Sequence, residues 1–169
     1  RLEKVKHPED VIHVLKKILS NSINYKALLI GDGKEIESLK NLTESLDIKD
    51  DVIFAGNKSQ IFISNIIPSS SIIVSPHTGR ALCEVSLAGA CVVAYDLDWQ
   101  SEIIENNVNG YLASYRNVNE LGNLSLSLIR DKNKQLIFQE NLRFKALNML
   151  DKKKLIKQEI EIFEKLINQ

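Results

Sequence analysis

The sequence predicts an α/β fold built on a doubly wound parallel sheet, and three observations indicate this class. Short apolar runs alternate with longer segments of helical periodicity, and each short run ends at glycine, proline or a polar turn. Runs that are apolar on both faces are typical of strands buried in a parallel sheet with crossover helices. Ligands bind outside the carboxyl ends of the strands in such sheets. The loops at 31–34, 55–59, 75–80 and 96–99 are therefore the candidates for function.

The first half of the chain shows this alternation clearly. Pro8 suits the first turn of a helix that runs to about Leu19, because apolar residues follow it at helical spacing. The next expected elements are a strand at 26–31 closed by Gly-Asp-Gly, a helix at 34–46, a strand at 52–55, a helix at 59–67 and a strand at 72–75. Gly56, Pro68 and Pro76 mark the ends of the last three.

The second half continues the pattern and then becomes helical. We expect a helix at 81–88, a strand at 91–95, a helix at 99–105, a brief strand at 111–113 and helices over most of 117–169. Asp98 is the expected N-cap of the helix at 99–105. The Lys-rich stretch Asp151–Lys157 is interpreted as a solvated helix face rather than a binding patch.

Length and composition indicate one soluble domain. A chain of 169 residues would bury roughly 70% of the surface of its unfolded form. Acidic and basic side chains balance at 22 each, so we expect no nucleic-acid partner. Cys83 and Cys91 lack metal or redox spacing and have apolar neighbours, which predicts buried free thiols in a reducing cytoplasm. Without an initiator Met or a signal peptide, we expect an excised domain of a cytoplasmic protein, with peripheral membrane association of the full-length protein as the alternative.

The loop from Ser75 to Arg80 is the candidate anion site. Thr78 or Gly79 can cap the helix that follows, which leaves backbone N–H groups pointing outward. Arg80 would fall in the first turn, where a cation opposes the helix dipole by ~0.3–1 kcal/mol unless an anion binds nearby. A surface pair between Arg80 and Glu84 without any ligand is the alternative interpretation, and both stay open.

Glu84 is the candidate for recognition of a sugar diol. It lies one turn inside the expected helix among apolar residues, so its carboxylate must reach solvent, a cation or a ligand hydroxyl. One carboxylate can accept both hydrogen bonds of a vicinal diol such as that of a ribose. A partly exposed glutamate at the helix edge is the alternative.

Other motifs exclude several classes. Gly31-Asp32-Gly33 is similar to the start of a dinucleotide fingerprint, but Ile36 occupies the position of the third glycine. We interpret it as a turn that caps the next helix. No Walker sequence is present, which disfavours a P-loop ATPase. The three histidines are not spaced as a metal site. His13 lies on an expected helix with Asp10, which favours a surface role. His77 lies beside the candidate anion site, with a structural role as the alternative.

The ordered set of motifs resembles the C-terminal, donor-binding domain of family-4 retaining glycosyltransferases of the GT-B architecture, the glycosyl transferases group 1. The resemblance covers nearly the whole chain. It is carried by Arg1-Leu2, Lys6-His7-Pro8, Ile30–Gly33, Val52–Gly56, Ser75-Pro76, Ala81–Gly89, Val92–Ala94, Glu102–Ile104 and Asn109–Leu112. It implies that 1–169 form a Rossmann-like GT-B half, with the N-terminal acceptor domain absent.

The resemblance also implies roles for single positions. Arg1 and Lys6 match residues that hold the donor's diphosphate, and Glu84 matches the second glutamate of the Glu-x7-Glu motif, which binds the ribose. Backbone amides at Arg80, Ala81 and Leu82 would meet the diphosphate. The loop at Gly56 and Asn57 would lie by the base.

One departure from the family pattern concerns the donor sugar. Pro76 stands where the family has the first glutamate of the motif. His77, Thr78 and Gly79 would then contact the sugar in its place. The position of His77 makes it, with Arg1 and Lys6, a candidate catalytic residue.

The function implied is transfer of a sugar, with retention, from a UDP- or GDP-linked donor to an unknown glycan or lipid-linked acceptor. The resemblance implies no obligatory metal and no cofactor. Cations and a helix N-terminus would stabilise the departing diphosphate. Two alternatives remain: a non-catalytic nucleotide-sugar-binding module, and a sugar-nucleotide epimerase of the same architecture.

Overall fold

The strands form two parallel sheets. The computed structural model describes residues 1–167. In this part of the chain β1 (Ala27–Ile30) pairs with β2 (Val52–Gly56), while β3 (Ile73–Ser75), β4 (Val92–Asp96) and β5 (Tyr111–Ser114) form a second sheet in that order. Every pair is parallel. The predicted α/β class with parallel strands and crossover helices is confirmed.

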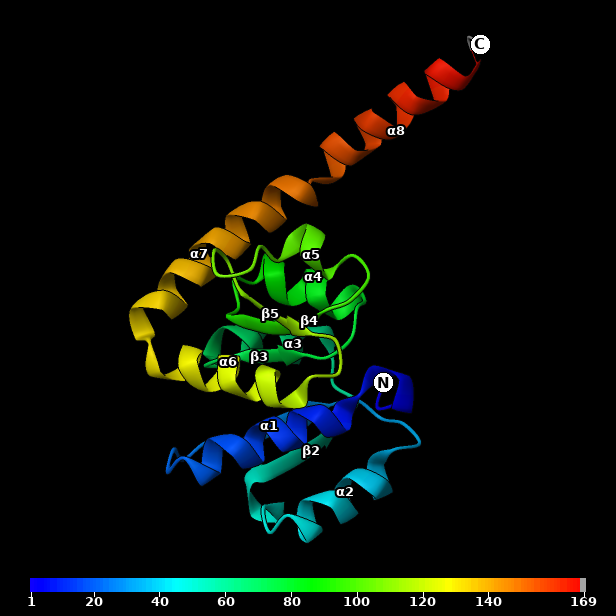
Figure 1. Cartoon of the computed structure of the whole chain (residues 1–169). Coiled ribbons are helices and arrows are strands. Elements are labelled where there is room, and N and C mark those ends of the chain that lie inside the picture. Colours follow the sequence, from blue (N-terminus) through cyan, green and yellow to red (C-terminus); the bar gives the residue numbers. More distant parts are fainter. Residues whose placement is uncertain (168–169) are drawn as a thin grey trace.

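Helices connect the strands and cover both sheets (Figure 1). They are α1 (Pro8–Ser20), α2 (Ile36–Ser45), α3 (Gln60–Ile66), α4 (Arg80–Leu87), α5 (Gln100–Ile103), α6 (Val118–Arg130), α7 (Lys132–Met149) and α8 (Lys152–Ile167), with 3-10 turns at Lys4–Lys6, Lys49–Asp51 and Ile67–Ser69. In Figure 1, α1 and α2 accompany the first sheet, α4 and α5 lie on one side of the second, and α6 lies on its other side next to α1.

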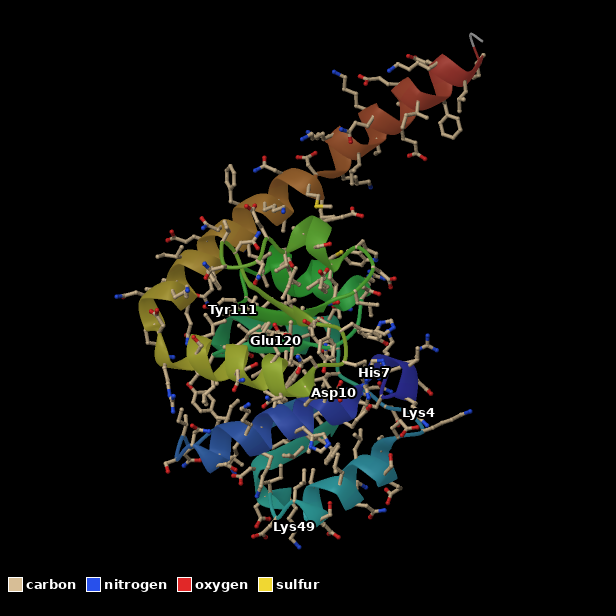
Figure 2. All side chains as sticks on the ribbon, viewed as in Figure 1. Lys4, His7, Asp10, Lys49, Tyr111 and Glu120 are labelled. Carbon is tan, nitrogen blue, oxygen red and sulfur yellow. The ribbon has the colours of Figure 1, made fainter. Side chains whose placement is uncertain are left out.

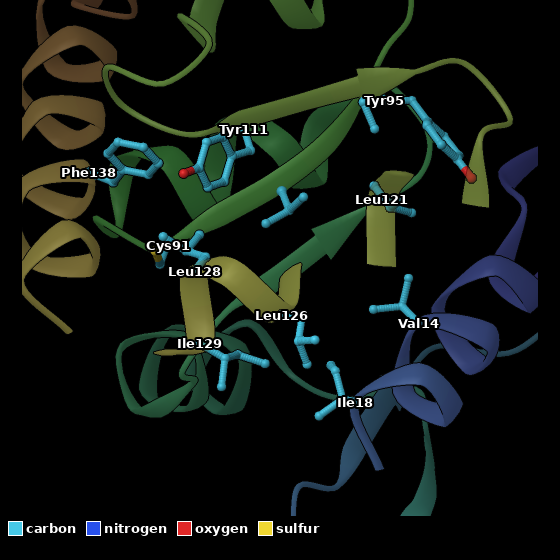
Figure 3. Packing of buried hydrophobic residues seen from close by; sticks show 12 residues of the cluster. Val14, Ile18, Cys91, Tyr95, Tyr111, Leu121, Leu126, Leu128, Ile129 and Phe138 are labelled. Carbon is cyan, nitrogen blue, oxygen red and sulfur yellow. The ribbon is translucent and has the colours of Figure 1, made fainter. Parts of the chain in front are cut away.

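The core is centred on β4, whose residues Val92–Tyr95 have no exposed surface. One apolar cluster fills the space between this strand, α1 and α6. Figure 3 shows Val14 and Ile18 of α1 facing the α6 side chains of this cluster. A second cluster lies on the opposite face under α4, α5 and α7. Burial of each large side chain there contributes about 1.5–3 kcal/mol. The two-sided burial explains why β4 is an unbroken apolar run.

Two expectations about local structure are wrong. The helix expected at 99–105 is shorter and ends at Ile103. It ends there because the Asn109 side chain binds the main chain: it donates to the carbonyl of Ile103 and accepts from the amide of Glu105. Asp98 does not cap this helix, whose N-cap is Trp99. Asp98 has a positive φ of 50° and accepts a hydrogen bond from another loop.

The C-terminal helix α8 extends away from the body of the protein (Figure 1). All of its described residues are exposed, and the solvated face expected over Asp151–Lys157 is confirmed. Between residues 1 and 167, none of the helices combines the length and the apolar character needed to cross a bilayer.

Candidate functional site

Several loops that follow the strands meet at one edge of the molecule. The amide of Gly31, after β1, donates to the carbonyl of Gly56, at the end of β2, over 2.9 Å. The Thr78 hydroxyl, after β3, donates to the Asp98 carboxylate, after β4, over 3.2 Å. These contacts join the loops in pairs. The loops that the sequence predicts to carry function are therefore in contact, in pairs, at the carboxyl edge of the strands.

Lys6 and the N-terminus of α4 come together at this edge. The 3-10 turn Lys4–Lys6 ends at His7, which adopts a left-handed conformation with φ 51°, and Pro8 then starts α1. The Lys6 ammonium lies 3.8 Å from the place that a Cβ on Gly79 would occupy. A lysine distant in sequence thus lies directly beside the start of the helix predicted to bind an anion.

The start of α4 leaves amides free. Gly79 is the N-cap, has φ 146°, and provides no side-chain cap. Leu82 is only 1% exposed, and its amide donates to the carbonyl of Gly79 over 2.9 Å. The amides of Arg80 and Ala81 lie in the first turn, where no intrahelical acceptor exists. A ligand at this edge would therefore reach the amides of Arg80 and Ala81 first.

The Arg80–Glu84 pair is formed. Arg80 Nε lies 3.3 Å from Glu84 Oε1, and the side chains are 89% and 31% exposed. An exposed pair of this kind contributes about 0–1 kcal/mol, so little holds it together. Glu84 is half-buried on the side of the helix next to β3. A ligand can therefore separate Arg80 from Glu84 at a small cost in free energy.

His77 has a defined tautomer. Its Nδ1 lies 2.6 Å from the carbonyl oxygen of Thr78. A carbonyl oxygen can only accept, so Nδ1 carries the hydrogen and, in the neutral ring, Nε2 is the acceptor. Thr78 is 8% exposed and directs its hydroxyl to Asp98. The loop thus holds His77 in place through its neighbours.

Arg1 lies at the end of β1. Its backbone nitrogen is 3.5 Å from the place of a Cβ on Gly31, and the next amide, of Leu2, donates to the carbonyl of Asp32 over 2.9 Å. A Cβ on Gly33 would stand 2.1 Å from the carbonyl oxygen of Leu2. Gly33 therefore admits a close approach of two chain segments. The interpretation of this turn as a helix cap is wrong, since the N-cap of α2 is Glu35.

Gly56 and Asn57 form the turn after β2. Gly56 has φ 66°, and nothing lies within 4 Å of the place of a Cβ on it. Asn57 is exposed. Both residues therefore border open space at the carboxyl edge.

An ion-pair network next to this edge was not foreseen. Asp10 is 1% exposed, while His13 on the same helix, for which the sequence favours a surface role, is half-buried. It accepts from the Tyr95 hydroxyl at 2.9 Å and from Arg116 Nη1 at 2.8 Å. Burial raises the pKa of the Asp10 carboxyl above its usual value, while the bonds from Tyr95 and Arg116 oppose the increase. Figure 2 shows Asp10 and His7 side by side.

The network continues to His7 and so to the turn that carries Lys6. Arg116 also donates to Glu9 Oε1 over 3.1 Å, and His7 Nε2 lies 2.9 Å from the Tyr115 hydroxyl. His7, Glu9 and Asp10 bring three possible metal-ligand atoms within 4.8 Å of one another. Because Arg116 already binds both carboxylates, we interpret the cluster as an anchor of the Lys4–Lys6 turn.

The parallel sheets define a Rossmann-like α/β domain, and the N-terminus of α4 lies at its carboxyl edge. Residues 1–145 match the glycosyl transferases group 1 family. The chain belongs to this family.

Individual relatives agree with this assignment. The chain is 24% identical over 157 residues to N-acetyl-α-D-glucosaminyl L-malate synthase of Bacillus anthracis, with 92% of this chain and 41% of the relative covered. It is 27% identical over 175 residues to an uncharacterised glycosyltransferase of Methanocaldococcus jannaschii, with 99% and 44% covered. The chain thus spans less than half the length of these relatives.

Solved structures show the same fold. HepE of Anabaena, in complex with UDP, superposes with a TM-score of 0.88 at 24% identity, covering 98% of this chain and 47% of that one. TarM of S. aureus, in a complex that includes UDP, superposes with a TM-score of 0.87 at 20% identity, covering 96% and 34%. The GT-B, Rossmann-like class is confirmed.

Proposed function

We propose that this chain is the C-terminal, donor-binding half of a family-4 retaining glycosyltransferase. It binds a nucleotide-diphosphate sugar, linked to UDP or GDP, and the sugar passes with retention to a glycan or lipid-linked acceptor. The observation that supports this best is the position of the Lys6 ammonium, 3.8 Å from the Cβ place of Gly79 at the start of α4. Glu84 lies one turn further along that helix.

The geometry suits recognition of a nucleoside diphosphate. The two phosphates would lie against the Lys6 ammonium and the amides of Arg80 and Ala81, because a helix N-terminus favours anions. The ribose diol would displace Arg80 from the Glu84 carboxylate. The base would lie by Gly56 and Asn57. HepE and TarM, which share the fold, were both solved with UDP, and this favours a uridine donor.

The same groups would act in the reaction. Cleavage of the bond between sugar and diphosphate builds negative charge on the departing phosphate oxygen. Preorganised donors aimed at such a charge contribute up to about 3–4 kcal/mol each to the transition state. Lys6, Arg1 and the first amides of α4 would stabilise the leaving group, while Nε2 of His77 would accept a hydrogen bond from a sugar hydroxyl.

The ribose assignment is tested by calorimetric titration of the Glu84→Gln variant with UDP and with 2′,3′-dideoxy-UDP. Loss of hydrogen bonds to a charged group costs about 1.5–3 kcal/mol, so affinity for UDP should fall about tenfold to a hundredfold. Affinity for the dideoxy nucleotide should not change. Glu37→Gln is the matched control, because Glu37 also forms an exposed helix pair, with Lys40 at 2.8 Å.

Two outcomes contradict the proposal. An equal loss for both nucleotides would show that Glu84 acts on something other than the diol. Absence of binding of UDP, GDP and ADP to the unsubstituted protein would remove the donor site altogether.

The acceptor would be bound by a separate N-terminal domain. We therefore expect nucleotide binding but no sugar transfer by residues 1–169 alone, measured with UDP- and GDP-sugars and a panel of acceptors. Robust transfer by this chain alone would contradict the division of labour.

A non-catalytic nucleotide-sugar-binding module is the second candidate, and Pro76 favours it, because the family's first glutamate would fall at this position. Sugar transfer by the full-length parent protein separates the two. Turnover supports the transferase, and tight nucleotide-sugar binding without turnover supports the module.

A further inference from the structure

Helix α7 carries apolar side chains on two opposite faces. The inner face is buried, since Phe138 and Leu142 are 1% and 0% exposed and belong to the two apolar clusters beside β4. The outer face carries four large apolar side chains that are at least half exposed: Leu136, Ile137, Phe144 and Leu147. A helix with apolar residues on opposite faces is normally covered on both. The outer face of α7 has no such cover among residues 1–167.

The exposed apolar side chains form a line that two charged residues interrupt. Positions 136, 140, 143 and 147 follow one another at intervals of four, three and four, and such intervals place residues on one face of a helix. The two inner positions are Glu140 and Arg143, and both are exposed. Positions 137 and 144 lie together along one side of this line. We call these six residues the outer stripe: Leu136, Ile137, Glu140, Arg143, Phe144 and Leu147.

The two charged residues of the outer stripe are available to a partner. Arg143 Nη1 donates to the carbonyl of Leu87, at the end of α4, over 2.8 Å. This bond fixes the direction of the guanidinium and leaves most of its five N–H groups for another acceptor. Within residues 1–167 the Glu140 carboxylate is exposed and forms no ion pair. The outer stripe therefore offers an oriented cation and an unpaired anion side by side.

The outer stripe is complementary to a second copy of itself. In an antiparallel pair of helices related by a two-fold axis, residue i contacts residue j of the other copy, and j contacts i. With the axis level with residues 141–142, Glu140 faces Arg143 of the second copy. In the same register Leu136 faces Leu147 of the second copy. Opposite charges meet at the centre and apolar side chains meet at both ends, and each pair occurs twice.

The side of the outer stripe next to the loop after α5 extends this match. There Ile137 lies opposite Phe144 of the second copy. A groove beside Phe144 is lined by Val108, Asn141 and Asn148, among others. The carbonyl of Val108 accepts from Asn141 Nδ2 over 2.9 Å, which ties the loop to α7. Ile137 of one copy would therefore enter the groove of the other.

We propose that the outer stripe is the interface of a homodimer in which the α7 helices of two copies pack antiparallel. The charges favour a second copy over a lipid surface, because lipid would bury the Glu140 carboxylate without a cation. The dimer leaves the donor edge free. In Figure 1, α7 runs along the flank opposite the N-terminus, where the Lys4–Lys6 turn lies. The proposal is therefore independent of the function proposed above.

The dimer is expected to be weak and reversible. α7 has 18 residues and is about 27 Å long. A single stripe on such a helix covers less than the roughly 800 Å² per partner of a standard interface. We expect a dissociation constant of roughly 10–300 μM.

The first test is sedimentation equilibrium of residues 1–169 from roughly 1 μM to 1 mM, a range that brackets this constant. The unsubstituted chain should change from monomer to dimer. Phe144→Glu should raise the dissociation constant by about a hundredfold or more, because two buried rings become charges. Ile61→Glu is the matched control, since Ile61 is 74% and Phe144 72% exposed, but Ile61 lies on α3. The control should leave the constant unchanged.

The second test exchanges the charges. In its own dimer, Glu140→Arg would face arginine with arginine, and Arg143→Glu would face glutamate with glutamate. Each variant alone should dimerise about tenfold to a hundredfold more weakly. An equimolar mixture of the two restores both pairs of opposite charge, so it should dimerise as tightly as the unsubstituted chain. If circular dichroism shows that Arg143→Glu does not fold, Glu140→Arg and Phe144→Glu alone decide.

Four results would overturn the proposal. They are a monomer throughout the concentration series, an equal loss of dimer with Ile61→Glu, a dimer that persists unchanged in Phe144→Glu, and a mixture of the two charge variants that is no tighter than either alone. Sedimentation with vesicles of phosphatidylcholine and phosphatidylserine that depends on Phe144, in a chain that does not dimerise, would assign the outer stripe to a lipid surface.

Discussion

Replacement of Lys6 by alanine should weaken the binding of diphosphates specifically. The Lys6 ammonium is the side-chain cation placed beside Gly79, 3.8 Å from the Cβ position. Alanine removes the charge and leaves the backbone turn intact, because His7 and the residues around it anchor the turn through Tyr115 and Arg116.

The size of the effect follows from the position of the charge. Two unit charges about 4 Å apart attract each other by ~1 kcal/mol in water and by ~4 kcal/mol near a protein surface. Lys6 is half-buried, so solvent screening reduces the net value to about 1–2 kcal/mol. The dissociation constant for UDP should rise roughly 5- to 30-fold. Affinity for uridine, which has no phosphate, should stay the same.

The measurement is calorimetric titration with UDP and uridine, at low salt and at high salt. Lys4→Ala is the matched control, since Lys4 belongs to the same 3-10 turn but is exposed. The Lys6 effect should shrink as the Debye length falls from ~10 Å to ~3 Å. An equal loss with Lys4→Ala, or an equal loss of uridine binding, would refute the placement of the diphosphate.

Three further predictions concern the scaffold of the site. Burial raises the pKa of Asp10, so its contribution to the free energy of unfolding is fully present below the unfolded pKa of about 3.9 and is lost as pH rises through the folded pKa. The unfolding free energy of the protein minus that of Asp10→Asn, from urea titrations, should therefore fall with rising pH; a flat difference would contradict this. Gly33→Ala should destabilise more than Gly56→Ala in the same assay, because its Cβ would meet a carbonyl oxygen at 2.1 Å, whereas the second costs only about 1–2 kcal/mol of backbone strain; the reverse order would be inconsistent with the close approach. A thiol reagent should modify Cys83 before Cys91 in the folded protein, since burial raises the pKa of the Cys91 thiol to about 12. Mass spectrometry gives the order of modification, and modification of Cys91 first would contradict the prediction.

Sequence periodicity located the elements because the residue pattern of each strand and helix agrees with its burial in the fold. Val92–Tyr95 is an apolar run with no polar interruption, and the structure buries it on both faces. The bounds of α1 to α4 lie within two residues of the predicted ones, and α1 begins at Pro8 as predicted. The helix after Asp98 was placed less well, because a side chain six residues beyond Ile103 ends it, and local propensity carries no information on such a contact.

The network around Asp10 shows what periodicity could have revealed and what it could not. Asp10, Val14 and Ile18 follow one another at intervals of four, so Asp10 lies on the stripe that α1 buries. That spacing was a usable signal for a buried carboxylate. Its partners Tyr95 and Arg116 are 85 and 106 positions away. Only the packing of α1 against the second sheet brings them together.

The Arg80–Glu84 pair can be reconciled with the proposed donor site through its weakness. A strong structural ion pair would hold the Glu84 carboxylate and exclude a ribose diol. This pair joins an arginine that is 89% exposed at the start of a helix, where a cation opposes the helix dipole. It contributes about 0–1 kcal/mol, so a ligand can separate the two partners easily. A diphosphate at the start of α4 would reverse the unfavourable position of Arg80 at the moment when the ribose engages Glu84. On the proposed function, the pair therefore occupies the site when no ligand is bound and does not compete strongly with the donor.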